Sequence, residues 1–221
     1  IYAAKVIQSH AAGKIHHGDV VMTYGYSSVI EGTLLQAHRQ GTRFEVVVID
    51  SRPLFDGRKL VERLLDAGIP TTYGLLSSLS ALVPRCSLVL LGTASLLSNG
   101  APYARAGTAM CAMMAHGYHI PVIICCETYK FSDRIQLDSF VVNEAGNCSD
   151  LLSHEDSDSK TDSRLLTPAE CSAQSRLKAV RLMYDVTPPK YISAIASEVG
   201  LSGTESVGVI LRDYKSVLFG I

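Results

Sequence analysis

Short apolar runs alternate with amphipathic segments along most of the chain, and turn residues separate them. Five apolar runs predict strands at Val20–Tyr24, Glu45–Asp50, Thr71–Tyr73, Ser87–Leu91 and Pro121–Cys126. Val46 to Ile49 are apolar in succession, which is typical of a strand that helices cover on both faces of a parallel sheet. Between these runs, segments that mostly end at a glycine predict helices at about Ser27 or Ser28 to Gln40, Arg58–Ala67, Ser77–Leu82 and Tyr103–His116.

This alternation predicts an α/β fold, with a doubly wound, mostly parallel Rossmann-like sheet and helices on both faces. Such sheets bind ligands at the carboxyl ends of their strands. After Val142 the alternation becomes less regular. The later residues predict a strand at Val180–Tyr184, a helix from Pro188-Pro189 to about Glu198 and a last short strand at Val207–Leu211.

Two segments lie outside the regular pattern. Ile1 to Ile15 resembles the tail of a helix whose beginning is missing. Residues 143–172 predict a mobile surface insertion, because Asn143 to Arg164 is rich in Ser and Asp and has almost no apolar content. An acidic or phosphorylated recognition segment is the alternative for this insertion.

Composition narrows the class of protein. The 221 residues are 47% hydrophobic, with 20 basic and 21 acidic residues, so the chain can bury a core and shows no basic excess. This argues against a nucleic-acid binder and against attraction to anionic membranes. The apolar runs are far shorter than the roughly 20 residues of a membrane span, and the first residues lack a signal-peptide core. We expect a soluble, cytoplasmic protein.

The six cysteines form no C-x-x-C pair, so no metal site is expected. Cys125 and Cys126 end a buried strand, and we interpret them as inert core thiols rather than nucleophiles. No glycine fingerprint of a dinucleotide site and no P-loop is present, so no cofactor is expected. Two pairs at turns, Ser27-Ser28 and Gly107-Thr108, fit either an anion cradle or plain helix starts.

Four strings carry a family resemblance: Val46–Pro53 followed by Gly57-Arg58; Leu90–Gly92 leading to Asn99-Gly100 and Arg105–Thr108; Pro121–Phe131; and Tyr184–Pro189. Together they resemble the carboxyl-terminal domain of the regulatory subunits of eukaryotic translation initiation factor 2B. The resemblance covers about Gly18 to Leu211 except the acidic insertion. The last two strings look most like the delta members among the alpha, beta and delta paralogues.

The resemblance implies a noncatalytic regulatory and scaffold subunit of a guanine-nucleotide exchange factor in the integrated stress response. The implied partners are a beta-type paralogue in a heterodimer, the alpha, gamma and epsilon subunits, and initiation factor 2, whose phosphorylation the complex senses. Residues 1–17 would end a helix of a missing amino-terminal helical domain, and residues 18–221 would form the Rossmann-like domain. Whether the isolated chain forms a homodimer stays open.

The same superfold includes isomerases that act on methylthioribose-1-phosphate and ribose-1,5-bisphosphate. They use a Cys after the first strand and an Asp in the loop after the fourth, and the matching positions here are Gly25 and Ala94. The resemblance therefore implies no catalytic residue and no enzyme. A remnant of the phosphate pocket is expected at Ser27, Ser28, Arg52, Asn99, Gly100, Gly107 and Thr108. A sugar-phosphate or nucleotide sensor and an active isomerase are the alternative functions.

Two polar–apolar segments at strand ends are expected at the subunit interface. They are Glu127, Thr128, Tyr129, Lys130 and Phe131, and Asp185, Val186, Thr187, Pro188 and Pro189. The helix over Tyr103–His116 is apolar on most sides, which fits a fully buried helix or one with a partly exposed interface stripe.

Overall fold

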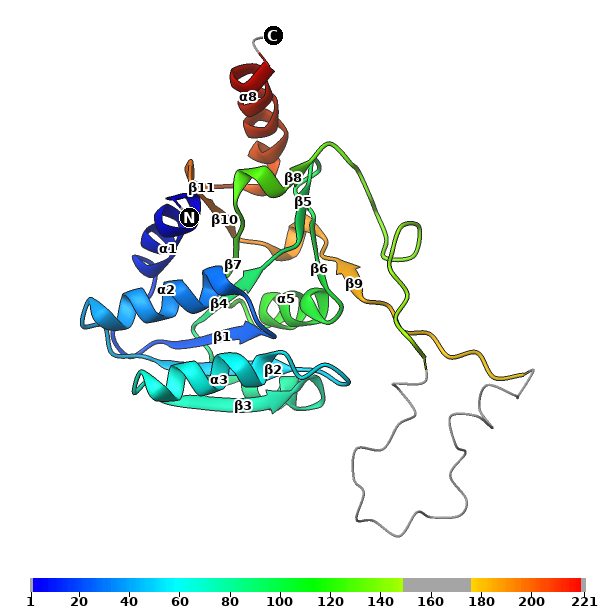
Figure 1. Cartoon of the computed structure of the whole chain (residues 1–221). Coiled ribbons are helices and arrows are strands. Elements are labelled where there is room, and N and C mark those ends of the chain that lie inside the picture. Colours follow the sequence, from blue (N-terminus) through cyan, green and yellow to red (C-terminus); the bar gives the residue numbers. More distant parts are fainter. Residues whose placement is uncertain (1, 149–175, 220–221) are drawn as a thin grey trace.

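The chain folds around a seven-stranded sheet of order β11-β10-β7-β4-β1-β2-β3 (Figure 1). The computed structural model describes residues 2–148 and 176–219, with side chains of the last helix described through Asp213. Neighbouring strands are parallel except β10 and β11. The strands are β1 (Val20–Tyr24), β2 (Glu45–Asp50), β3 (Thr71–Leu75), β4 (Leu88–Gly92), β7 (Val122–Cys125), β10 (Ala194–Ser197) and β11 (Gly200–Ser202). The five strands predicted before residue 130 are confirmed.

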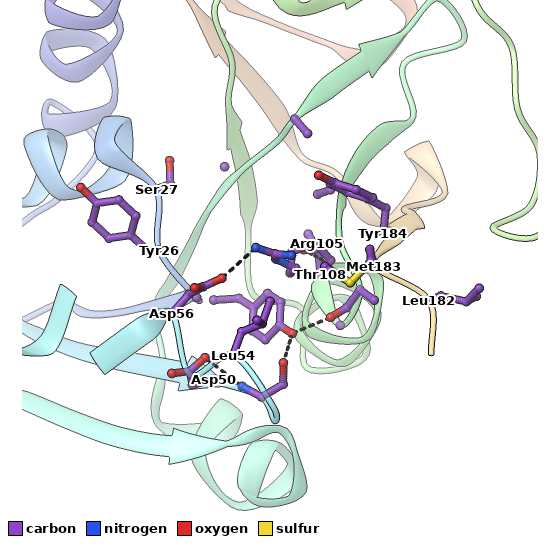
Figure 2. Close-up of a pocket in the computed structure, with 18 of the residues that line it drawn as sticks. Tyr26, Ser27, Asp50, Leu54, Asp56, Arg105, Thr108, Leu182, Met183 and Tyr184 are labelled. Carbon is purple, nitrogen blue, oxygen red and sulfur yellow. Dashed lines mark hydrogen bonds and ion pairs between the residues drawn. The ribbon is translucent and has the colours of Figure 1, made fainter. Parts of the chain in front are cut away.

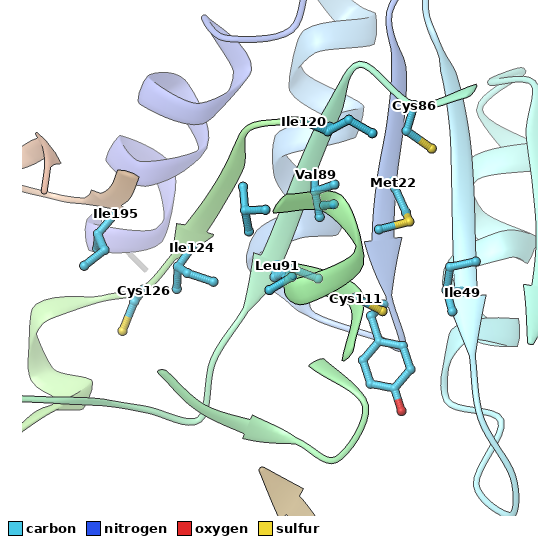
Figure 3. Close-up of a cluster of buried hydrophobic side chains, with 14 of the residues drawn as sticks. Met22, Ile49, Cys86, Val89, Leu91, Cys111, Ile120, Ile124, Cys126 and Ile195 are labelled. Carbon is cyan, nitrogen blue, oxygen red and sulfur yellow. The ribbon is translucent and has the colours of Figure 1, made fainter. Parts of the chain in front are cut away.

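Helices cover both faces of this sheet, which confirms the predicted fold class. One face packs against α1 (Tyr2–Ala12), α2 (Ser28–Arg39) and α3 (Gly57–Asp66). The other packs against α4 (Leu79–Leu82), α5 (Thr108–Gly117) and the start of α8 (Val207–Phe219). Within β2, Val46 and Val48 point into the first layer while Val47 and Ile49 point into the second, shown in part in Figure 3. The continuous apolar run therefore reflects burial on both faces.

A second, four-stranded sheet follows the carboxyl ends of β4 and β7, and the sequence did not predict it. Its order is β8-β5-β6-β9. The strands are β5 (Ser95–Leu97), β6 (Pro102–Arg105), β8 (Phe131–Ser132) and β9 (Tyr184–Val186). The helix predicted from Tyr103 is therefore wrong over its first residues, since these pair with β5 and β9 and α5 begins only at Thr108.

Three predictions for the last third of the chain are wrong, two of them at or before β10 and one at α8. The strand predicted at Val180–Tyr184 is displaced to β9, and Leu182 forms only an isolated bridge with Ala145. The helix predicted after Pro188 is a single 3-10 turn, Pro189–Tyr191, followed by β10, because the exposed edge of β7 takes up that segment as a parallel partner.

The strand predicted at Val207–Leu211 is the first turns of α8. Val207 and Leu211 are buried four residues apart against the core, and Ile210 packs beside them, which is helical rather than strand periodicity. Of the predicted insertion at 143–172, residues 149–172 lie outside the described part of the chain. Gly146 donates its N–H to the carbonyl of Arg181, so the first residues of this segment pair with the returning chain.

Two kinds of feature are absent from the described residues. None of the helices there is long and apolar enough to cross a membrane. No cluster of His, Cys, Asp or Glu within 2–148 and 176–219 is arranged to hold a metal ion.

Candidate functional site

A cavity of about 670 Å³ opens at the carboxyl ends of β1, β2 and β4 (Figure 2). The turn between β6 and α5 and residues 180–184 form its other walls. The lining includes seven positions that the sequence singled out: Gly25, Ser27, Ser28, Arg52, Ala94, Gly107 and Thr108. The structure thus brings most of the predicted pocket together at the expected edge of the sheet.

Asn99 and Gly100 do not line this cavity. They form the turn between β5 and β6, where Asn99 Oδ1 accepts the N–H of Ala101 at 3.2 Å. Gly100 has a φ of +80°, and a Cβ there would collide with the carbonyl oxygen of Thr204. Asn99 therefore shapes the hairpin turn, and Gly100 lets it lie against the turn that precedes α8.

The start of α5, where an anion cradle was considered, already binds a carboxylate of the chain. Asp185 Oδ2 accepts the N–H groups of Gly107 at 2.7 Å and Ala109 at 3.0 Å. The Thr108 hydroxyl is also occupied, since it donates to the carbonyl of Arg105 at 2.6 Å. Burial raises the pKa of Asp185 to about 6. The two N–H donors have the opposite, smaller effect and lower the pKa.

Gly107 is required at this turn. Its φ is +112°, and a Cβ would lie 2.5 Å from the Tyr24 hydroxyl oxygen. That hydroxyl donates to the carbonyl of Ala106 and lies 2.7 Å from Ser51 Oγ, so β1, β2 and the α5 turn are joined at the floor of the cavity.

An ion pair crosses the cavity from β6 to the loop before α3. Arg105 Nη2 donates to Asp56 Oδ2 at 2.8 Å, shown as a dashed line in Figure 2. The two side chains are 39% and 41% exposed, so the pair adds at most about 1 kcal/mol to stability. The pair matters more for ligand binding than for stability, because the carboxylate neutralises the positive charge that the guanidinium would present to the cavity. On its other side Arg105 approaches the ring of Tyr184, which stacks on Tyr103 at 4.8 Å.

Asp50, at the end of β2, is buried and fully engaged within the chain. Its Oδ1 accepts the N–H of Ser51 at 2.9 Å, and its Oδ2 accepts the N–H of Gly57 at 2.9 Å and the hydroxyl of Tyr73 at 3.0 Å. It therefore caps α3 and fixes the loop beneath the cavity. Three carboxylates at this edge, those of Asp50, Asp56 and Asp185, thus have partners in the protein itself.

Two positions that the sequence singled out for lost chemistry lie in the wall of the cavity. Gly25 and Ala94 both line it and carry no side chain that donates, accepts or attacks. The thiols of Cys86, Cys111, Cys125 and Cys126 are buried in the core, away from the lining. Burial raises the pKa of Cys125 to about 12, so the thiolate form that a nucleophile needs is disfavoured there.

The segment 127–131, expected at the interface, is mostly internal. Glu127, Thr128 and Phe131 are buried, and the N–H of Thr128 donates to Glu198 Oε2 at 3.0 Å. Lys130 Nζ forms an ion pair with Glu127 Oε2 at 2.7 Å. Tyr129 is the member of this segment that is widely exposed.

The segment 185–189 is also largely inside the fold. Val186 and Thr187 are buried in or beside the small sheet, and Pro188 and Pro189 are half-buried. On α5, Cys111 and Ala115 are buried whereas Met110 and Met113 are exposed, so this helix has a partly exposed apolar face.

Sequence reasoning missed the pairing of Asp56 with Arg105 and the role of Asp185 as a helix cap. Arg105 lies in one of the strings that carry the resemblance, directly before the turn into α5, and that position was the available signal. The partners, 49 and 78 residues away from their contacts, leave no local pattern.

Comparison with known proteins places the chain in a family. Residues 1–204 match the initiation factor 2 subunit family. The chain belongs to this family. It is 41% identical to translation initiation factor eIF2B subunit delta of Schizosaccharomyces pombe over 98% of its length, and 39% identical to that of Dictyostelium discoideum over 99%. It spans 46% and 35% of those proteins, which is less than half of each.

Solved structures agree with the sequence comparison. The tetrameric eIF2B-beta2-delta2 complex from C. thermophilum contains a chain that superposes with a TM-score of 0.74 at 32% identity, over 89% of this chain and 56% of that one. Ribose 1,5-bisphosphate isomerase of Archaeoglobus fulgidus is more distant in sequence, at 29% identity over 90% of this chain and 59% of that protein. The family resemblance, including its likeness to delta members, is confirmed.

Proposed function

We propose that this chain is the carboxyl-terminal domain of a delta-type regulatory and scaffold subunit of the guanine-nucleotide exchange factor for translation initiation factor 2. The observation that carries the proposal is the similarity to delta subunits over nearly the whole chain. It is combined with a cavity in which Gly25 and Ala94 stand at the positions of the isomerases' Cys and Asp. The site of this activity is the cytoplasm, where translation initiates.

The cavity supports a noncatalytic role for two independent reasons. Gly25 and Ala94 stand where the related isomerases carry a thiol and a carboxyl, so the two side chains that act in those enzymes are missing here. Asp185 binds the amides at the start of α5, and Asp56 binds Arg105, so the groups best suited to a phosphate already hold carboxylates.

The partners follow from the proposed role. The chain pairs with a beta-type paralogue as a heterodimer, joins the alpha, gamma and epsilon subunits, and contributes to sensing phosphorylated initiation factor 2. The beta2-delta2 composition of the solved relative supports the first pairing. Residues 18–221 serve as the assembly domain in this proposal, and α1 is the end of a helical region that precedes it.

Co-expression with a beta-type subunit tests the role directly. We expect a stable complex by light scattering after gel filtration, and no turnover of ribose-1,5-bisphosphate by the chain alone. Isomerase turnover that disappears in Arg52→Ala would refute the noncatalytic role, and absence of any complex with the beta-type subunit would refute the scaffold role.

Ligand sensing without chemistry is the second candidate, and the cavity volume favours it. About 670 Å³ lies within the range of roughly 300 to 1,000 Å³ that small-molecule sites occupy. Ser27, Ser28 and Arg52 line its outer part. Calorimetry with a panel of phosphorylated metabolites tests it: saturable heat that Arg52→Ala removes supports sensing, and no heat from any member of the panel refutes it.

A further inference from the structure

The loop from Ile135 to Asn143 has its polar and apolar residues in reversed positions. It follows β8, and Figure 1 shows this green stretch running out from the body of the protein between β8 and the grey segment. In an ordinary surface loop the polar side chains face solvent and the apolar ones are covered. Here the polar side chains hold the backbone together and the apolar ones project outward.

Two polar side chains fix the first half of the loop. Gln136 is buried, and its Nε2 donates to the carbonyls of Asp138 at 2.6 Å and Val142 at 3.0 Å. Asp138 Oδ1 accepts the N–H groups of Phe140 at 2.7 Å and Val141 at 3.1 Å. These bonds satisfy backbone groups that would otherwise need water, so the loop has a defined shape.

Two more polar side chains attach the loop to β9. Asn143 Nδ2 donates to the carbonyls of Ser139 at 2.7 Å and Tyr184 at 2.6 Å, and its Oδ1 accepts the N–H of Tyr184 at 3.2 Å. The N–H of Val186 donates to Ser139 Oγ at 3.0 Å. The loop is therefore anchored to the small sheet at its middle and at its carboxyl-terminal end.

The apolar side chains of this loop are exposed to solvent. Their exposed fractions run from 47% to 88%, in Ile135, Leu137, Phe140, Val141 and Val142. A single exposed apolar side chain needs no explanation, but five on one short hydrogen-bonded loop point to a contact surface. A shape fixed in advance lowers the entropic cost of binding, so this arrangement suits a contact surface.

We propose that the 135–143 loop docks onto the paralogous regulatory subunit, and this inference rests on the proposed function. The relative at 32% identity was solved as a beta2-delta2 complex, in which chains of this family contact one another. The charge of the loop region argues against anionic occupants of the apolar side chains. Residues 133–144 carry Asp133, Asp138 and Glu144 against Arg134, a net charge of −2. Such a balance repels anionic lipid and nucleic acid.

The loop forms part of a larger contact. A stable interface buries about 800 Å² on each partner, which is more than five side chains supply. Tyr129, exposed in the turn just before β8, extends the apolar surface along the chain. We place Leu137 and Phe140 as its anchors, because they are the largest and most exposed apolar side chains of the loop.

The test compares Phe140→Asp and Leu137→Asp with Val199→Asp in the full chain, each mixed with purified beta-type subunit. Val199 is a matched control, since it is also an exposed apolar side chain, 66% exposed, and belongs to the turn between β10 and β11. We expect the two loop variants to weaken the heterodimer by about 30-fold or more, as measured by sedimentation equilibrium. Val199→Asp should match the wild type. Thermal unfolding of each variant alone should stay within about 2 °C, since no buried group changes.

The outcomes separate the loop from the proposed function. Loop variants that bind as tightly as the wild type, while the wild type does form the heterodimer, overturn the docking surface and leave the scaffold role standing. A wild type that forms no heterodimer overturns both. A third outcome is that no heterodimer forms, the chain self-associates, and Phe140→Asp abolishes this self-association. That result would assign the loop to a second copy and overturn the choice of a paralogue.

Discussion

Asp185 gives the domain an unusual dependence of stability on pH, and Asp185→Asn isolates it. The carboxylate caps α5 through Oδ2, while its Oδ1 is buried with no hydrogen-bond partner among the described residues. Burial therefore outweighs the two N–H donors and raises the pKa to about 6 from an ordinary value of 3.8. Asparagine keeps an oxygen that accepts the same two N–H groups but removes the titration.

The magnitude follows from the two pKa values. A carboxyl whose pKa is higher in the folded protein binds its proton more tightly there, so protonation stabilises the fold. The contribution is fully present below pH 3.8 and is lost as the pH rises through 6. Between pH 7 and pH 5 the free energy of unfolding of the wild type should rise, relative to Asp185→Asn, by about 1.3 kcal/mol.

Urea denaturation at pH 5, 6 and 7 measures this difference. Far-UV circular dichroism is the suitable signal, because the chain contains no tryptophan. Asp66→Asn, an exposed change at the end of α3, is the matched control for the loss of one carboxylate. A difference between wild type and Asp185→Asn that stays flat, or shrinks as the pH falls, would show that the helix amides outweigh burial and would refute the reasoning.

Three further predictions test the cavity and its surroundings. Asp56→Ala frees Arg105 and should create phosphate binding that the wild type lacks, seen as a rise in melting temperature that corresponds to about 1.4 kcal/mol at ten times Kd; an equal rise in the wild type would contradict the blocked site. Gly100→Ala should destabilise the domain by about 3 kcal/mol in urea, since its Cβ meets the carbonyl of Thr204, and unchanged stability would contradict the tight turn. Cys125 should resist alkylation at pH 8 until the protein is unfolded, because its pKa is raised to about 12, and labelling of the native protein as read by peptide mass would contradict its burial.

The main sheet was predictable because its signals are local. Val46 to Ile49 form an unbroken apolar run. The helices α2, α3 and α5 end at a glycine or within two residues of one, as the pattern indicated. The small sheet left no such signal. Its strands have two to four residues, and they exist because they pair with segments far away in the chain, as Tyr103 does with Val186.

The errors after Pro188 have the same origin. Ala194 to Ser197 became a strand because β7 offered an unpaired parallel edge, and the preceding prolines only shaped a turn. At Val207 the β-branched residues favoured a strand by propensity, yet burial of every fourth residue against the core decided for a helix. Local preference was overridden in both places by tertiary packing.

The sequence predicted where the cavity lies but not which of its polar groups are already bound within the protein. Strand ends located Arg52 and Gly107 correctly, since ligand sites of such sheets lie there. Whether those groups were available depended on Asp56, in the loop before α3, and Asp185, in β9, which reach their partners only in the folded chain.

The outward-facing side chains of the 135–143 loop have a consequence for the supply of this subunit in the cell. A copy without its partner displays Leu137 and Phe140 to every chaperone and protease that recognises exposed apolar residues. Its lifetime should therefore depend on the abundance of the paralogue, so that surplus chains are removed and the complex keeps its stoichiometry. Phe140→Asp should lengthen the half-life of the lone chain in a pulse–chase measurement while shortening that of the chain co-expressed with its partner. Equal half-lives with and without the paralogue would contradict this form of control.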